Sequence, residues 1–276
     1  MRIKKIIIIA IIILVLLLLG YTIFKAYKNY KKYDFKVYFF NAGKADAIII
    51  SKGDKYMMID TGEEELSDEI LAYFKNNNIT KLDYLIITHF DKDHVGSAST
   101  IINNIEIGEV IQSNVPKDSE YYDNYIEALS NKNITPKTVS GNYEITLSDV
   151  DITINGPEVI YEKNESNNSS LIVSMTNGNN KFLFTGDAEN ARLNDYIEKI
   201  NTTYDFIKIP YHGNYLKKLD ELLNKTNPKY AVITCSNKEG AEEDTLDLLD
   251  SLNIKYYLTR NGDVTILSNG TDIIIN

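Results

Sequence analysis

Short apolar runs recur along the chain from about residue 35 and alternate with segments of helical periodicity. Apolar runs of four to eight residues with β-branched and aromatic side chains are typical of strands, and apolar positions three or four apart are typical of helices. The first half has helical patterns from Glu63 to about Asn77 and from Ser119 to Asn131. Its expected strands and one expected hairpin are FKVYFF, DAIIIS, KYMMID, LDYLIITH and NYEITLSDVDITING.

The second half repeats this scheme after the polar loop YEKNESNNSS. Helices are expected over Ala188 to Ile200 and Glu242 to Leu252. Its expected strands are SLIVSMT, KFLFTGD, the start of YDFIKIPYHG, YAVITCS, KYYLTR and DVTILS. Two halves of mixed strands followed by helices predict two sheets stacked face to face with helices outside, in one domain over residues 33–276.

The amino-terminal 32 residues follow a different pattern. Ile6 to Phe24 is apolar except for Gly20, Tyr21 and Thr22, which is close to the ~20 residues that a helix needs to cross the hydrocarbon of a bilayer. A cleaved signal peptide is the alternative, but the apolar run is long for one and no small-x-small cleavage motif precedes the basic stretch. We therefore predict a single-pass transmembrane anchor over residues 1–32.

The charge balance changes at the same boundary. Residues 1–32 carry seven basic side chains and no acidic one, so the remaining 22 basic side chains stand against all 39 acidic ones, a net charge of −17. A basic collar favours anionic lipid, whereas an acidic domain repels nucleic acid unless metals or a local basic patch intervene. Basic residues flank both ends of the apolar run, so orientation is weakly determined; a cytoplasmic amino end with an extracytoplasmic domain is slightly favoured.

The single cysteine gives no disulfide framework. Cys235 lies in the apolar run YAVITCS, where a small buried hydrophobic side chain is the simplest interpretation. A single cysteine therefore favours neither a reducing nor an oxidising compartment.

Polar clusters follow several of the apolar runs. The segment THFDKDHVG holds two of the three histidines of the chain, and further aspartate and histidine residues follow other strands. Imidazole nitrogens and carboxylate oxygens are ligands of Zn²⁺ and Mn²⁺. The spacing allows one ion to be bound by His89 and Asp91 and a second by Asp93 and His94. Asp60 precedes Thr61 and Gly62, where a turn-forming role is favoured over a metal role.

Six segments together resemble the metallo-β-lactamase-fold hydrolases, and within them the soluble hydrolase domain of ComEC-type competence proteins. They occur in the family's order over about residues 35–270, and they are FFNAGKADAIII, MMIDTG, THFDKDHVG, NNSSLIV, FLFTGD and KIPYHGN. The resemblance implies an α/β domain of the αββα four-layer sandwich type, here preceded by the expected transmembrane helix.

The resemblance also implies a site for two divalent metal ions, Zn²⁺ or Mn²⁺. His89 and Asp91 correspond to ligands of the first ion. The ligands of the second ion are expected at Asp93, His94 and His212. Asp187 corresponds to the carboxylate that bridges both ions.

Several positions depart from the family pattern. No histidine lies between His94 and His212 to complete the first site; Asn168, Ser169 and Ser170 occupy that region. The pattern is also altered at Asn41, Ala45, Tyr211 and Asn214. The first ion is therefore expected to be held weakly, and contacts to substrate or to the metal ligands are expected from Asn168, Ser170, Tyr211 and Asp60.

The predicted function is that of a membrane-anchored hydrolase of phosphodiesters, a phosphodiesterase or nuclease. A bound metal lowers the pKa of water from about 15.7 toward 7, which supplies hydroxide at neutral pH without a side-chain nucleophile; Asp93 is expected to orient that hydroxide. Hydrolysis of another ester, a lactone or a β-lactam is an alternative because fold does not fix substrate. A non-catalytic binding module with a degraded site is a second. The charge predicts weak binding of DNA, and no protein partner is inferred.

Overall fold

The computed structural model describes the backbone of residues 2–163 and 165–276, and the side chains of residues 9, 11–25, 33–163 and 165–276. Contacts divide the chain into two units, Met1–Asp34 and Phe35–Asn276. The first contains the helix α1 (Arg2–Lys32). Within the described residues, no helix combines the length and the apolar character that a bilayer crossing requires. The predicted transmembrane anchor is therefore not confirmed, and part of it falls on residues whose side chains lie outside the description.

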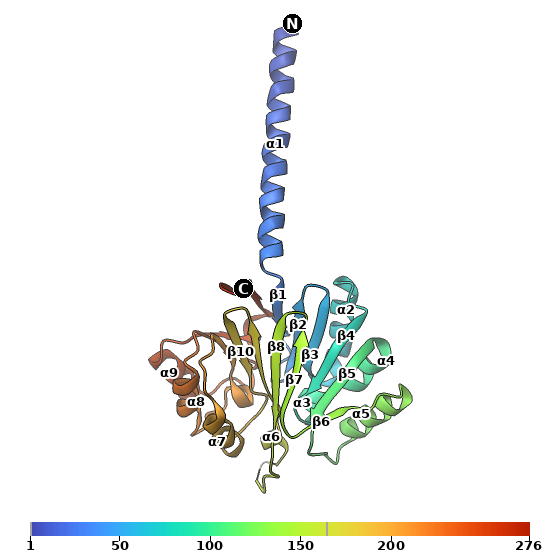
Figure 1. The fold of residues 1–276 in the computed structure, drawn as a ribbon, viewed down its shortest axis with the longest axis vertical. Helices are drawn as coiled ribbons and strands as arrows, with labels where there is room; N and C mark the ends of the chain where they lie inside the picture. Colours follow the sequence, from blue (N-terminus) through green and yellow to red (C-terminus); the bar gives the residue numbers. More distant parts are fainter. Residues whose placement is uncertain (1, 164) are drawn as a thin grey trace. The chain divides into compact units, whose positions relative to one another are not determined.

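The second unit contains two β-sheets (Figure 1). The first sheet has eight strands in the order β15-β14-β1-β2-β3-β4-β5-β6. Strands β3 to β6 run parallel to one another, and the remaining pairs are antiparallel. The strands are β1 (Phe35–Phe39), β2 (Ala47–Lys52), β3 (Lys55–Thr61), β4 (Lys81–Ile87), β5 (Glu106–Ser113), β6 (Lys137–Val139), β14 (Val264–Ser268) and β15 (Ile273–Ile275).

The second sheet has seven strands in the order β13-β12-β11-β10-β9-β8-β7. Strands β10 to β13 are parallel, and β7 to β10 pair antiparallel. The strands are β7 (Gly141–Leu147), β8 (Val150–Gly156), β9 (Ile172–Asn177), β10 (Asn180–Phe184), β11 (Phe206–Lys208), β12 (Tyr230–Ile233) and β13 (Lys255–Leu258).

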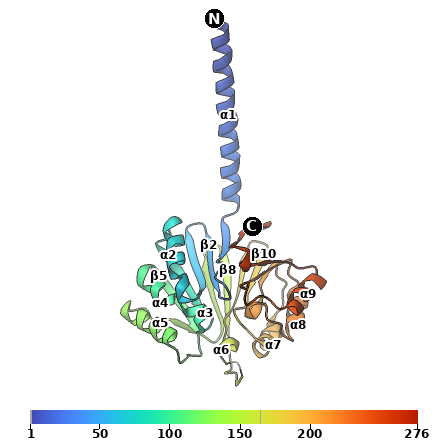
Figure 2. The same cartoon turned by 180° about the vertical axis from the view of Figure 1, so that it is seen from behind.

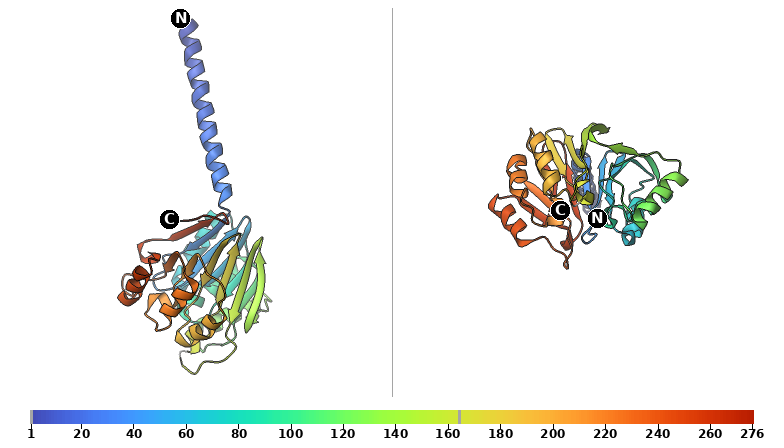
Figure 3. Two further views of the ribbon diagram at one scale, coloured as in Figure 1. Left: turned by 60° about the vertical axis from the view of Figure 1, so that its left-hand side comes forward. Right: turned by 90° about the horizontal axis from the view of Figure 1, so that it is seen from below.

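Helices cover the outer face of each sheet (Figures 1 and 2). Against the first sheet pack α2 (Ser67–Asn76), α4 (Ala98–Asn104) and α5 (Glu120–Asn131). Against the second pack α7 (Asn190–Lys199), α8 (Leu219–Thr226) and α9 (Glu243–Ser251). The short helices α3 (Lys92–Val95) and α6 (Glu165–Asn168) and three 3₁₀ turns, Glu64–Leu66, Pro210–Gly213 and Thr259–Asn261, complete the unit. The view along the sheets in Figure 3 shows the helices outside both of them.

The hydrophobic pattern explains this layering. In β1 the side chains of Phe35, Val37 and Phe39 alternate with less buried ones and pack between the two sheets. In β2 the run is buried on both faces, with Ile48 toward the other sheet and Ile49 toward the helices. Continuous apolar strands of this kind are expected where both faces of a sheet are covered. Three apolar clusters thus fill the three spaces between four layers, which confirms the predicted α/β sandwich with two sheets.

Candidate metal centre

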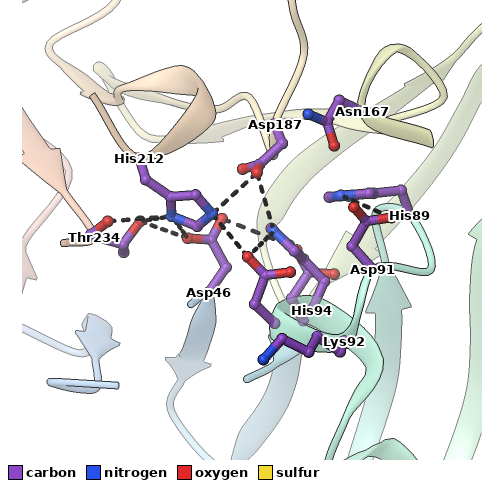
Figure 4. Close-up of polar contacts among 12 residues, drawn as sticks. Asp46, His89, Asp91, Lys92, His94, Asn167, Asp187, His212 and Thr234 are labelled. Carbon is purple, nitrogen blue, oxygen red and sulfur yellow. Dashed lines mark hydrogen bonds and ion pairs between the residues drawn. The ribbon is translucent and has the colours of Figure 1, made fainter. Parts of the chain in front are cut away.

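The candidate ligands lie at the carboxyl ends of parallel strands of both sheets. Asp60 is the second-last residue of β3, His89 follows β4, and Asp187 follows β10. His94 lies in α3, and His212 in the 3₁₀ turn after β11. Because parallel strands place their carboxyl ends at the same edge of a sheet, residues from distant segments meet at one site (Figure 4).

Four side chains converge closely enough to share one ion: Asp93, His94, Asp187 and His212. One ligand atom from each lies within 4.8 Å of the others. Asp187 Oδ2 is 3.0 Å from His212 Nε2 and 3.4 Å from His94 Nε2. Asp93 Oδ2 is 3.4 Å from His212 Nε2. Each sheet therefore supplies two of the four donors, one carboxylate and one imidazole apiece.

His94 is oriented through its second nitrogen. Its Nδ1 lies 2.8 Å from Asp60 Oδ2, and Asp60 also accepts hydrogen bonds from the backbone N–H and the hydroxyl of Thr88, both at 2.7 Å. Since a carboxylate only accepts, His94 Nδ1 donates, and Nε2 keeps its lone pair whenever the ring is neutral. Asp60 has φ 54°, a turn conformation, but its carboxylate is buried and holds His94.

His212 is oriented in the same way by a different pair of residues. Its Nδ1 is 3.0 Å from Thr234 Oγ1 and 3.1 Å from the carbonyl of Thr234. The Thr234 hydroxyl donates its one hydrogen to Asp46 Oδ1 at 2.6 Å, so its oxygen can only accept from His212. This arrangement leaves His212 Nε2 unprotonated whenever the ring is neutral.

His89 is also oriented through its Nδ1 atom. Its Nδ1 lies 3.2 Å from Thr88 Oγ1, whose hydrogen is donated to Asp60, and 3.4 Å from Ser170 Oγ. Ser170 Oγ also accepts from the backbone N–H of Asp187 at 3.1 Å. The imidazoles of His89 and His94 pack with their centroids 4.0 Å apart.

A buried ion pair that the sequence did not reveal stands beside this group. Lys208 Nζ lies 2.5 Å from Asp46 Oδ2 and 3.5 Å from Asp187 Oδ1. Both residues are buried, with an exposed fraction of 0% for Lys208 and 1% for Asp46. Lys208 is therefore not part of a solvated basic face. Of the other lysines near the motifs, Lys92 pairs with Glu63 and Lys218 with Glu221.

Acidic groups dominate the electrostatics of the four-ligand cluster. Burial would lower the pKa of both His94 and His212, but the nearby carboxylates, Asp187 foremost, raise it well above the usual value for His94 and to about 9 for His212. Burial opposes ionisation of Asp187, yet His212, His94 and Lys208 hold its pKa well below its usual range. Such carboxylates attract a cation, and a divalent ion would replace the ring protons.

His89 and Asp91 lie outside the four-ligand group. His89 Nε2 is 3.9 Å from Asp91 Oδ1, and burial together with the charge of His94 lowers the pKa of His89 to about 4. Asp91 Oδ1 accepts from Lys117 Nζ at 2.5 Å and from the hydroxyl of Ser166. Across the described residues, groups of at least three candidate ligands are formed by the four-ligand cluster and by Asp46, Asp60 and His94, and neither includes Asp91.

The loops that carry these ligands adopt conformations that L-residues rarely take. Asp60, Tyr211 and His212 have φ of 54°, 51° and 53°, which costs of order 1–3 kcal/mol each and is typical of functional sites. Gly186 has φ 50°, and a Cβ there would lie 3.1 Å from Ser170 Cβ and from Thr88 Oγ1. Glycine thus lets the loop after β10 approach the residues that hold His89.

The other expected contact residues have varied surroundings. The Asn168 side chain accepts from the backbone N–H of Arg192 and donates to the carbonyl of Lys163, so it serves the start of α7. Its neighbour Asn167 is drawn beside Asp187 in Figure 4 and donates to Glu189 at 2.8 Å. Partial burial and the carboxylates of the site, Glu189 and Asp187 first, raise the pKa of Tyr211, so its hydroxyl keeps its hydrogen.

The donor set fits a divalent cation. Among the described residues, Nε2 of His89, His94 and His212 is buried and makes no hydrogen bond of good geometry, although each ring is fixed through Nδ1. Nε2 of His94 and of His212 faces the carboxylates that would share the ion with it. Orphaned buried polar atoms are rare in folded proteins, and imidazole nitrogens held by an outer carboxylate or hydroxyl are typical metal ligands. Mixed nitrogen and carboxylate donors suit ions such as Zn²⁺ or Mn²⁺. Fold and site together define a protein of the metallo-β-lactamase fold with a candidate metal centre.

Comparison with known proteins agrees with this class. The profile described as "Metallo-beta-lactamase superfamily" matches residues 41–236, so the chain belongs to that superfamily. Among curated proteins, it is 25% identical to ComE operon protein 3 of Bacillus subtilis over 80% of this chain and 32% of that protein. It is 28% identical to Recombination protein 2 of Haemophilus influenzae over 75% of this chain and 25% of that protein. These relatives confirm the resemblance to ComEC-type proteins; the chain spans about a third or less of their length.

Solved structures share the fold at low sequence identity. The metallo-β-lactamase fold protein YhfI from Bacillus subtilis superposes with a TM-score of 0.55 and 10% identity, over 88% of this chain and all of that one. Tm1679, a metal-dependent hydrolase of the β-lactamase superfamily, gives a TM-score of 0.54 and 15% identity, over 81% and 94% of the two chains.

Proposed function

We propose that this chain is a metal-dependent phosphodiesterase. The observation that carries the proposal is the convergence of Asp93, His94, Asp187 and His212, in which both imidazole Nε2 atoms are buried and point at the two carboxylates. A divalent ion held there would lower the pKa of a bound water and stabilise negative charge that develops on the substrate.

Different residues of the chain would orient the metal ligands, face the substrate and hydrogen-bond the attacking water. Asp60 and Thr234 fix the rings of His94 and His212 so that Nε2 faces the centre. The carboxylates of Asp93 and Asp91 are more exposed than the buried rings, so they mark the side from which a substrate would approach. Asp93, with a pKa held well below its usual range by His94 and His212 despite burial, is ionised and able to accept a hydrogen bond from the attacking water.

Cationic side chains on the approach side favour an anionic substrate. Lys117 lies against Asp91, and Lys44 lies 5.7 Å from the ring centroid of Tyr211, whose hydroxyl can donate a hydrogen bond. A phosphodiester carries a charge that these groups complement, whereas an uncharged lactone or aryl ester does not. The name of one relative, Recombination protein 2, supports a nucleic acid context. The net charge of −17 beyond residue 32 favours a small phosphodiester over long DNA, with DNA cleavage steeply inhibited by salt.

A substrate panel tests the proposal. The purified protein, loaded with Zn²⁺ or Mn²⁺, should hydrolyse a bis-aryl phosphate faster than an aryl ester, a lactone or a β-lactam. A preference for the lactone or the β-lactam would transfer the assignment to that alternative. Less than a tenth of an equivalent of metal after reconstitution would favour a non-catalytic binding module instead.

Two ligand variants assign the roles. Asp93→Asn and His94→Ala should each lower turnover of the bis-aryl phosphate by at least tenfold in folded protein, since each removes a donor to the ion. Circular dichroism should show that both variants remain folded. If both keep more than a tenth of the wild-type rate, the assignment fails. Attachment to a membrane through residues 1–32 is a separate proposal, which fractionation of cells would test.

A further inference from the structure

Lys117 occupies the half of the site where the sequence predicted the first metal ion. Its ammonium lies 2.5 Å from Asp91 Oδ1, and the same oxygen accepts from the Ser166 hydroxyl. That oxygen is also the Asp91 atom 3.9 Å from His89 Nε2. An ion between His89 Nε2 and this oxygen would compete with the two donors that already hold the oxygen.

We propose that Lys117 is a built-in cation that competes with a metal ion for Asp91, so that the chain binds one ion tightly and a second only weakly. The inference rests on the proposed function, because it concerns the same metal centre. An ammonium and a divalent ion so close to one carboxylate oxygen repel each other, so loading of the His89–Asp91 half requires Lys117 to move away.

The surroundings of Lys117 make such movement feasible. Its side chain is about a third exposed (35%), and its other polar contact among the described residues is a 3.5 Å approach to Ser166 Oγ. His89, in contrast, is fully buried and fixed by Thr88 and Ser170. The position therefore has one immobile nitrogen ligand and a carboxylate whose availability depends on a movable lysine. A second ion would be admitted only at high metal concentration.

The experiment measures metal stoichiometry and affinity rather than turnover. The full chain and its Lys117→Met variant are titrated with Zn²⁺ and, separately, Mn²⁺ in competition with a chelating dye, and bound metal is counted by elemental analysis. We expect the wild type to take about one equivalent tightly. Lys117→Met should bind a second equivalent at least tenfold more tightly than the wild type does.

Two controls separate charge from packing. Lys117→Arg keeps the cation and should leave the second equivalent weak. Lys92→Met removes the same charge from the start of α3, between Asp91 and Asp93. Because the ammonium of Lys92 pairs with Glu63 instead, binding of the second ion should change by less than threefold. Circular dichroism confirms folding of each variant.

The possible results lead to distinct conclusions. Two equivalents bound with equal affinity by the wild type, or no gain in Lys117→Met, would overturn the role of Lys117 and leave the hydrolase proposal standing. An equal gain in Lys92→Met would show a general charge effect and would also overturn it. Absence of bound metal in every variant would refute both proposals together.

Discussion

The buried pair Lys208–Asp46 allows a quantitative prediction for Lys208→Met. This change leaves Asp46 in a fully buried position with its nearest cation removed, and it removes a positive charge 3.5 Å from Asp187. The pKa of Lys208 is raised, because Asp46 and Asp187 outweigh the opposing effect of burial, so a charged ammonium is what the variant loses.

The magnitude follows from the geometry. At the 2.5 Å separation of Lys208 Nζ and Asp46 Oδ2 and an effective dielectric constant of about 20, the attraction is about 7 kcal/mol. Part of this offsets the desolvation of both groups, and removing one partner of a buried pair typically costs about 3–5 kcal/mol of unfolding free energy. For a unit of this size, each kcal/mol lowers Tm by roughly 2–4 °C, so we expect a decrease of roughly 6–20 °C.

The assay is thermal unfolding in the presence of a chelator, followed by circular dichroism. Metal must be removed because a bound cation would compensate the charge that Lys208→Met leaves behind. Lys229→Met is the matched control: it breaks an exposed pair with Asp205 and should cost about 0–1 kcal/mol. The double variant Asp46→Asn with Lys208→Met should recover at least half of the loss, because no buried charge stays unpaired.

A Tm for Lys208→Met within about 2 °C of the wild type would refute the reasoning. It would mean that Asp46 finds another cation or takes up a proton without cost. Equal losses in Lys208→Met and in the double variant would instead assign the effect to packing of the lysine stem rather than to charge.

Three further predictions concern the metal centre. Thr234→Val removes the hydroxyl between Asp46 and His212 but leaves the backbone carbonyl that also accepts from the ring, so metal affinity should fall by about tenfold, the low end of the usual range; an unchanged dye-competition titration would contradict this. Metal binding at pH 7.5 should release at least one proton, because the pKa of His212 is about 9 without metal and the ion requires the neutral ring, so affinity should rise with pH up to about 9. Calorimetry in buffers of different ionisation enthalpy measures this release, and a buffer-independent enthalpy would count against it. Gly186→Ala should lower stability by about 1–3 kcal/mol through its positive φ and its contact with Ser170, measured by urea unfolding; a neutral effect would show that the loop can relax.

Much of the fold could be predicted from apolar periodicity. The expected helices at Ser119 to Asn131 and Glu242 to Leu252 correspond to α5 and α9, and Ser119 caps α5 by accepting from the Tyr122 backbone N–H. The strand β5 was not predicted, because Gly108 and two glutamates interrupt its apolar pattern. Glycine is needed at position 108 because a Cβ there would lie 2.6 Å from the carbonyl of Asp83 in the neighbouring strand. Helix α8 was also missed, in the segment LDELLNKT.

The candidate site was predictable where rare residue types mark it. The three histidines of the chain marked His89 and His94 in the segment THFDKDHVG and His212 in KIPYHGN, and the structure gathers the last two with Asp93 and Asp187. Of the residues that hold the rings, Asp60 and Ser170 were among the expected contacts. Thr88 and Thr234, together with the pair Asp46 and Lys208, were missed because threonine, lysine and aspartate are common throughout the chain. One signal was available for Asp46: a charged residue between two alanines at the start of an otherwise apolar strand is expensive to bury without a role.

The division of the four ligands between the two sheets has a mechanical consequence. Asp93 and His94 follow a strand of the first sheet, and Asp187 and His212 follow strands of the second. A bound ion would therefore cross-link the two halves of the sandwich at one edge. Without it, the four acidic and imidazole groups share protons there beside the Lys208–Asp46 ion pair. Removal of the ion by a chelator should therefore separate the two sheets at this edge before the strands of either sheet unfold. In amide exchange, protection would be lost first in the loops after β4, β10 and β11, while the strand interiors keep theirs.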